Sequence, residues 1–266
     1  GADYDVASWD SYPLGFLDLA DLDDAMKARY RRRGHPDWAA FHHDLYRAVG
    51  RGRFGVMEQQ PGPVNWAPHN AQPAAGMARL WGWEAIAHGA EFVSWFRWRQ
   101  LPVAQEQFHA GVLHADATPA PAHGDIKRLA RELAELELGD TRPARVALVF
   151  DYEACWVTDI QPQSAGFAAL TLALEWYSAA RLNGLDVDIV STDAALNGYA
   201  LVLLPCLPML EHALLDRITA SGARWLAGPR AGSRTNEFAI PDGLAPGALR
   251  TLVDLRITGV DALRPG

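Results

Sequence analysis

The chain has 266 residues, of which 49% are hydrophobic and 21% charged, a balance typical of a folded globular protein. Its formal net charge of −8 argues against nucleic acid or an anionic membrane as the main partner. No stretch of about 18 apolar residues predicts a membrane span, and the first residues lack the pattern of a secretion signal. Cys155 and Cys206 are the only cysteines, so no disulfide framework is predicted and we expect a cytoplasmic location.

The first half of the chain alternates predicted strands with predicted helices. The strands are expected at Tyr4–Trp9, Phe54–Met57 and Phe92–Phe96, and the helices at Pro36–Val49, Ala75–His88 and Asp125–Leu138. A strand, a loop and a helix repeated in this order predict a parallel sheet with helical crossovers. Three such units are too few to close a barrel of eight, which needs about 250 residues.

Polar and aromatic residues gather after the predicted strand ends, at Tyr12, Glu58, Trp66, Arg97, Arg99, Glu106 and His109. In a (β/α)8 barrel the catalytic groups lie at this face of the sheet. We therefore expect residues 1–141 to carry a site at the ends of these strands.

A second alternation begins after Thr141-Arg142-Pro143, which is the expected domain boundary. It contains strands at Arg145–Phe150, Val187–Val190, Leu201–Leu204 and Arg224–Ala227, with helices at Phe167–Leu182 and Ala213–Ala220. This pattern predicts that residues 142–266 form a flavodoxin-like or amidotransferase-like α/β domain.

The stretch RFGVMEQQPGPVNW contains the sharpest candidate for chemistry. Glu58 stands where an apolar strand ends, before a rigid Pro/Gly loop that leads to Trp66, as a fixed nucleophile or base requires. The alternative without a catalytic role is that Glu58 is a surface residue or is paired with a nearby arginine. Seven of the ten tryptophans precede position 100. They indicate either core packing or a cleft in which indole faces stack on sugar rings.

Glu106 and His109 form one Glu-x-x-His pair, which can bind a metal when both side chains share a helix face. The alternatives are a structural pair and the recognition of sugar hydroxyls, which carboxylate and imidazole both hydrogen-bond and which we favour. His35, His42 and His43 are expected to be surface or loop residues rather than metal ligands. Cys206, flanked by prolines, lacks the small residues of a nucleophile elbow and is expected to be a small buried residue.

Four stretches resemble glycoside hydrolase family 42, the bacterial β-galactosidases: DVASWDSYPLG, VMEQQPGPVNWAPHN, AHGAEFVSWFRWRQ and EQFHAG. The resemblance implies that residues 1–141 form the C-terminal part of that family's (β/α)8 barrel. The part beyond Thr141 resembles the trimerisation domain of the family, so the resemblance covers essentially the whole chain. It implies a galactoside substrate, a homotrimer and no cofactor, because the zinc cluster of some members lies upstream of this part.

The resemblance also implies a role for each candidate residue. Glu58 matches the nucleophile at the end of barrel strand seven, and Tyr12 matches a tyrosine beside it. Trp66 matches the indole lining the galactose subsite, and Glu106 and His109 match the pair that binds sugar hydroxyls. Retaining enzymes of this kind use two carboxyl groups about 5–5.5 Å apart, one as nucleophile and one as acid/base.

The acid/base glutamate of the family follows strand four beside an asparagine, and no Asn-Glu pair precedes Tyr12. The chain opens without Met, so we expect a piece of a longer enzyme that has negligible hydrolytic activity alone. Two alternatives stay open. One is a non-catalytic carbohydrate-binding or assembly module, if the chain truly begins at Gly1. The other is a metal-dependent hydrolase built on Glu106 and His109.

Overall fold

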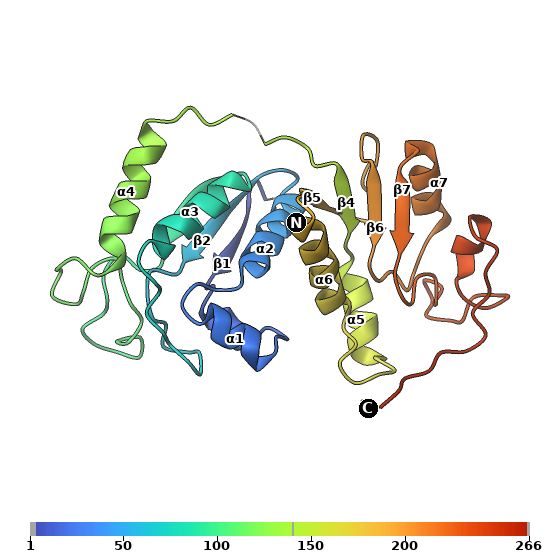
Figure 1. The fold of residues 1–266 in the computed structure, drawn as a ribbon, viewed down its shortest axis with the longest axis horizontal. Helices are drawn as coiled ribbons and strands as arrows, with labels where there is room; N and C mark the ends of the chain where they lie inside the picture. Colours follow the sequence, from blue (N-terminus) through green and yellow to red (C-terminus); the bar gives the residue numbers. More distant parts are fainter. Residues whose placement is uncertain (1–3, 140, 265–266) are drawn as a thin grey trace. The chain divides into compact units, whose positions relative to one another are not determined.

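The computed structural model describes residues 4–139 and 141–264, and the chain forms two compact units, residues 1–142 and 143–266. Unit 1 is built on a parallel sheet in the order β1-β2-β3, of which β1 and β2 are labelled in Figure 1. Its strands are β1 (Ala7–Ser11), β2 (Phe54–Gln59) and β3 (Ala90–Trp95). Its helices are η1 (Gly15–Leu17), α1 (Asp24–Tyr30), α2 (Pro36–Val49), α3 (Met77–Ala87) and α4 (Ala122–Ala134). Parallel strands that neighbour one another in chain order are the arrangement of a (β/α)8 barrel wall.

One face of this sheet carries the core of unit 1. Trp9, Phe54, Val56 and Ala90 pack there with residues of α2 and α3. The opposite face bears Met57 and Phe92, which are 49% and 36% exposed. In a closed barrel this second face is the packed interior.

The bounds of several elements differ from those expected. Strand β1 begins and ends later than Tyr4–Trp9, and α4 begins at Ala122 and ends at Ala134 rather than covering Asp125–Leu138. Glu58 lies inside β2, because the strand continues through Gln59 by pairing with its parallel neighbours. Helix α1 and the helix over Tyr152–Ile160 were not expected from the sequence.

The expectation that His42 and His43 are surface residues is wrong. The side chain of His43 is 1% exposed, and its Nδ1 accepts a hydrogen bond of 3.2 Å from the indole of Trp9. The ring of His42 stacks on Trp9 at 5.1 Å between centroids. Burial lowers the pKa of His42, so its ring is neutral and contributes to packing.

Unit 2 contains a second parallel sheet in the order β5-β4-β6-β7 (Figure 1). Its strands are β4 (Val146–Val149), β5 (Val187–Val190), β6 (Leu201–Leu204) and β7 (Arg224–Ala227). Helices α5 (Tyr152–Ile160) and α6 (Ala169–Leu182) lie on one side of it, and α7 (His212–Ser221) on the other. A short turn of 3-10 helix, η2, covers Gly247–Thr251. This order matches the first four strands of the flavodoxin-like fold.

Strand β4 is buried on both faces, which explains its continuous apolar sequence, whereas the edge strand β7 is exposed at Arg224 and Leu226. One face of β4 and β6 packs on Leu214, Leu215 and Ile218 of α7. Among the residues that the structure describes, no helix is both long enough and apolar enough to cross a membrane.

Candidate active site

Glu58 is positioned by an irregularity in β2. Trp9 of β1 pairs with Val56, but the next residue, Asp10, pairs with Glu58, so β2 carries one extra residue at Met57. The pairing with β3 shifts over the same stretch. An extra residue of this kind bends the strand and re-aims the side chains beside it. The partly buried Glu58 side chain therefore departs from the simple alternation of the strand.

Tyr12 contacts Glu58 directly. Its hydroxyl donates a hydrogen bond of 2.5 Å to Oε2 of Glu58. Burial is the main cause that raises the pKa of Tyr12 far above its usual value, and the bond to Glu58 adds to it. The phenol therefore stays protonated and remains a donor to the Glu58 carboxylate.

A second carboxyl group lies beside this pair. Asp10 is the register partner of Glu58, and partial removal from water, followed by the negative charge of Glu58, raises the pKa of Asp10. The end of β1 and β2 therefore concentrates negative charge, which suits the stabilisation of a developing positive charge.

Aromatic rings form a wall around Tyr12. The rings of Trp66 and His109 meet that of Tyr12 edge to face, with centroids 5.5 and 5.7 Å away. Trp66 is 44% exposed and also lies 6.0 Å from Phe16. A Cβ atom on Gly15 would lie 2.5 Å from Cη2 of Trp66, so only glycine permits the indole to lie this close to the backbone.

His109 is buried with a defined proton position. Its Nδ1 lies 3.2 Å from the carbonyl oxygen of Ala110, which only accepts, so Nδ1 carries the proton. Burial lowers the pKa of His109 and keeps the ring neutral. Nε2 is then an acceptor, and the described residues offer it no donor.

Glu106 is held by an arginine that the sequence alone did not assign to it. Nη2 of Arg97 donates to Oε2 of Glu106 at 2.7 Å, and the guanidinium lies 4.7 Å from the ring centre of Phe96. The Glu106 side chain is 43% exposed, so it reaches solvent while Arg97 fixes its position. The backbone N–H of His109 also donates to the Glu106 carbonyl at 3.1 Å.

One amide side chain links the loops that carry these groups. Oε1 of Gln60 accepts from the N–H of Leu14 at 2.9 Å, and its Nε2 donates to the carbonyl of Gly62 at 2.8 Å. The backbone N–H of Gln60 donates to the carbonyl of Ser11 at 2.9 Å. The loops after β1 and β2 are thereby joined through a fully buried residue.

The structure thus brings together Tyr12, Glu58, Trp66, Glu106 and His109, the five residues for which the family resemblance implies a role. Sequence reasoning missed the parts played by Asp10, Gln60 and Arg97. The signal for Arg97 was its position directly after a strand and nine residues before Glu106. No comparable signal marks Gln60, because its partners are backbone atoms of another loop. The described residues contain no cluster of three or more His, Cys, Asp or Glu side chains suited to a metal ion.

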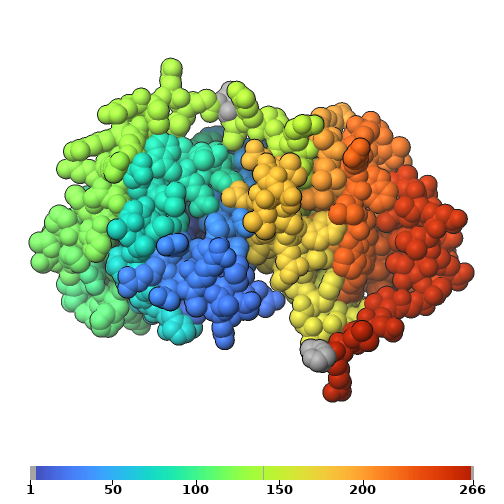
Figure 2. Space-filling view, viewed as in Figure 1, coloured from blue at the N-terminus to red at the C-terminus, as the bar shows by residue number. Residues whose placement is uncertain are grey.

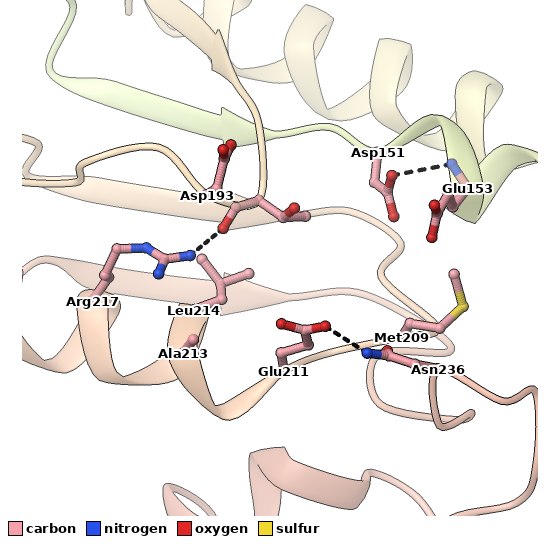
Figure 3. Close-up of a pocket in the computed structure, with 10 residues that line it drawn as sticks. Asp151, Glu153, Asp193, Met209, Glu211, Ala213, Leu214, Arg217 and Asn236 are labelled. Atoms are coloured by element: carbon pink, nitrogen blue, oxygen red, sulfur yellow. Dashed lines mark hydrogen bonds between the residues drawn. The ribbon is translucent and has the colours of Figure 1, made fainter.

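Unit 2 contains a hollow of about 480 Å3 at the C-terminal ends of its strands (Figure 3). Two of its carboxylates serve local structure. Asp151 accepts from the N–H of Glu153 at 3.0 Å, and Glu211 accepts from Asn236 at 2.5 Å. Cys206 is 5% exposed in an apolar cluster, and burial raises its pKa to about 11, so its thiol stays protonated.

Both units match models of known protein families. Residues 1–136 match the glycoside hydrolase family 42 model described as β-galactosidase. Residues 144–266 match the model described as the β-galactosidase trimerisation domain. The chain belongs to this family. Unit 1 is accordingly a portion of the family 42 barrel, and unit 2 corresponds to the region that the family model describes as the trimerisation domain.

Several relatives align over nearly the whole chain. A β-galactosidase of Thermus thermophilus is 56% identical over 99% of this chain and 41% of the relative. A β-galactosidase of Halorubrum lacusprofundi is 40% identical over 98% of this chain and 38% of the relative. The crystal structure of β-galactosidase from the psychrophilic Marinomonas ef1 matches with a TM-score of 0.94 at 49% identity, over 99% of this chain and 42% of that one. The chain therefore spans about two fifths of the length of these proteins.

Proposed function

We propose that this chain supplies the nucleophile-bearing side of the active site of a retaining β-galactosidase, which releases terminal β-D-galactosyl residues from oligosaccharides. The observation that carries the proposal is the 2.5 Å bond from Tyr12 to Glu58 beside the partly exposed Trp66. A fixed carboxylate next to an indole face is suited to a sugar ring that stacks on the indole and presents its anomeric carbon to the carboxylate.

In the first step Oε1 or Oε2 of Glu58 attacks the anomeric carbon and forms an ester bond, while the glycosidic C–O bond breaks. The departing oxygen takes a proton from a second carboxylic acid, which we place in a part of the enzyme outside this chain. In the second step that carboxylate removes a proton from water, and the resulting attack frees galactose and Glu58. By itself, this chain is then expected to bind galactosides without turnover.

The neighbours of Glu58 support this chemistry. Tyr12 stabilises the carboxylate before attack and again as it leaves the sugar. Glu106 accepts hydrogen bonds from sugar hydroxyls through its exposed carboxylate, and Nε2 of His109 is a buried, unpartnered acceptor that a hydroxyl reaches once the surrounding side chains shift. The negative charges of Asp10 and Glu106 favour the positive charge that develops on the ring in the transition state.

We further propose that the protein assembles as a homotrimer through unit 2 and acts in the cytoplasm. The match of residues 144–266 to a trimerisation domain supports the first statement. The two free cysteines, Cys155 and Cys206, are compatible with the second.

The experiment that tests the catalytic proposal replaces Glu58 by Ala in the protein expressed from its native reading frame. Turnover of a dinitrophenyl β-galactoside should fall by about four orders of magnitude or more, as removal of a nucleophile typically does. Azide should restore part of it and yield galactosyl azide of the α configuration, because azide enters from the side that Glu58 vacates. Glu91→Ala, an exposed glutamate of β3, serves as the control. A β-azide, or no azide product, would remove Glu58 from the nucleophile role.

A further inference from the structure

Helix α5 turns its small side chains inward and its large apolar ones outward. Ala154, Val157 and Thr158 are at most 2% exposed, whereas Trp156 is 58% and Ile160 is 75% exposed. Tyr152 begins the same outward side and is 46% exposed. The yellow segment that contains α5 forms part of the visible surface of unit 2 (Figure 2). A surface helix normally shows the reverse distribution.

Contacts on the inner side fix this orientation. Ala154 packs with Ala169 and Cys206, at a place sized for small residues. The hydroxyl of Thr158 donates to the carbonyl of Cys155 at 2.9 Å and accepts from the N–H of Ala169 at 3.3 Å. Rotation of the helix to bury Trp156 would break these bonds and force an indole into the space of a methyl group. The fold of unit 2 therefore imposes the exposure of Trp156 and Ile160.

The two ends of α5 are also tied down. At the start, the side chain of Asp151 accepts from the N–H of Glu153 as an N-cap. At the end, Nη1 of Arg230 donates to the carbonyl of Gln161 at 2.8 Å. The outward side is thus presented on a rigid support, which reduces the entropy lost when a partner binds.

We propose that one face of α5 docks against a second copy of this chain. This α5 face consists of Tyr152, Trp156 and Ile160. Spaced four apart, these residues lie along one side of the helix over about 12 Å. Tyrosine and tryptophan are the residue types that dominate binding at protein interfaces. The proposal rests on the assembly proposed above, since the match to a trimerisation domain covers the residues that carry the α5 face.

Charge and symmetry define the partner further. Glu153 and Asp159 flank the α5 face, and the chain is acidic overall, so anionic lipid and nucleic acid are repelled. A closed ring of three copies uses head-to-tail contacts, in which a patch meets a different patch on the next copy. The α5 face is then one half of this interface, and the receiving surface lies elsewhere on the neighbouring chain.

The first test measures molar mass by light scattering for the protein expressed from its native reading frame and for Ile160→Glu and Trp156→Glu. Both variants should associate at least about 30-fold more weakly than the parent, the loss expected at an interface hot spot. Leu182→Glu changes an 85% exposed leucine at the end of α6 and should leave the mass unchanged. Circular dichroism verifies that each variant is folded, and Ile160→Ala provides a milder replacement.

If the parent is oligomeric and both glutamate variants have the same mass as the parent, the proposal for the α5 face is overturned while the proposed assembly stands. If the parent is a monomer, both the proposed assembly and the proposal for the α5 face are overturned. In neither case is the role of Glu58 affected, since the azide experiment reports on that separately.

A second test places a photo-reactive phenylalanine at position 160 in a mixture of 14N and 15N chains. Crosslinked peptides that join light to heavy chains would support the proposal and identify the receiving surface. Crosslinks found only within chains of one isotope would show that the α5 face packs inside its own chain and would overturn the proposal.

Discussion

The hydroxyl of Tyr12 donates to Oε2 of Glu58 at 2.5 Å, and the two residues lie at the ends of neighbouring parallel strands. Because the pKa of Tyr12 is raised, this donor persists over the whole working pH range of an enzyme. Tyr12 thus acts as a permanent hydrogen-bond donor to the Glu58 carboxylate. The geometry makes the bond directly testable.

Tyr12→Phe removes the hydroxyl and keeps the ring contacts with Trp66 and His109. A hydrogen bond to a charged group contributes about 1.5–3 kcal/mol, so kcat should fall roughly 10- to 100-fold with little change in fold. Steady-state kinetics and a thermal melt measure both effects. A kcat equal to that of the parent would show that Tyr12 has no part in the proposed reaction.

Trp66→Ala should weaken galactoside binding more than it slows the chemical step. Stacking of an aromatic ring contributes about 0.5–1.5 kcal/mol, which corresponds to a rise in KM of about 2- to 10-fold. Gly15→Ala offers an independent check, because the added methyl displaces the indole without removing it. If both variants retain the parent KM, the indole does not line the subsite.

Arg97→Met should release Glu106 and raise KM for galactosides, while Arg97→Lys should restore part of the binding. The matched control is Arg53→Met, which breaks an exposed ion pair with Glu91 at 2.7 Å. Exposed pairs of this kind contribute little to stability. Equal effects of the two methionine variants on KM would mean that Arg97 acts only through the stability of unit 1.

Asp10→Asn should change how stability depends on pH. The raised pKa of Asp10 means that the folded protein holds this proton more tightly than the unfolded chain. Stability therefore falls as pH rises from the usual aspartate range through the raised value, and an asparagine removes that loss. The difference in Tm, variant minus parent, should become more positive across this window. Asp21→Asn, at an exposed site, is the control, and a difference that does not change with pH would contradict the assignment.

The helices and strands that the sequence predicts best have strong local signals. Pro36 begins α2, the apolar residues of that helix recur at helical spacing, and its bounds agree with the expectation. Strands β5, β6 and β7 are short apolar stretches next to turns, and their bounds also agree. Helix α5 was missed because apolar residues lie on both of its sides, so its sequence lacks the amphipathic spacing that marks a surface helix. Its N-cap, Asp151, is recognisable in the sequence.

The site is less predictable than the elements that carry it. Glu58 and Trp66 stand out in the sequence because they follow an apolar stretch and a rigid loop. Their geometry depends on the extra residue at Met57 and on contacts with Tyr12, which is 46 residues from Glu58. No periodicity in the sequence encodes such pairings, so the order of the strands had to be known first.

The buried amide of Gln60 has a consequence for how the site meets its ligand. Because Gln60 hydrogen-bonds to the loops after both β1 and β2, we expect Tyr12 and Glu58 to keep their relative positions when a ligand binds. The distance between them in the free protein should therefore equal that in a sugar complex, whereas the exposed side chains of the segment between Trp98 and Phe108 are less constrained. That segment exposes Trp98, Val103 and Phe108 to solvent. Under the proposed function, we expect Tyr12, Glu58 and Glu106 to hold the galactosyl ring, and these exposed side chains to meet what is attached to it.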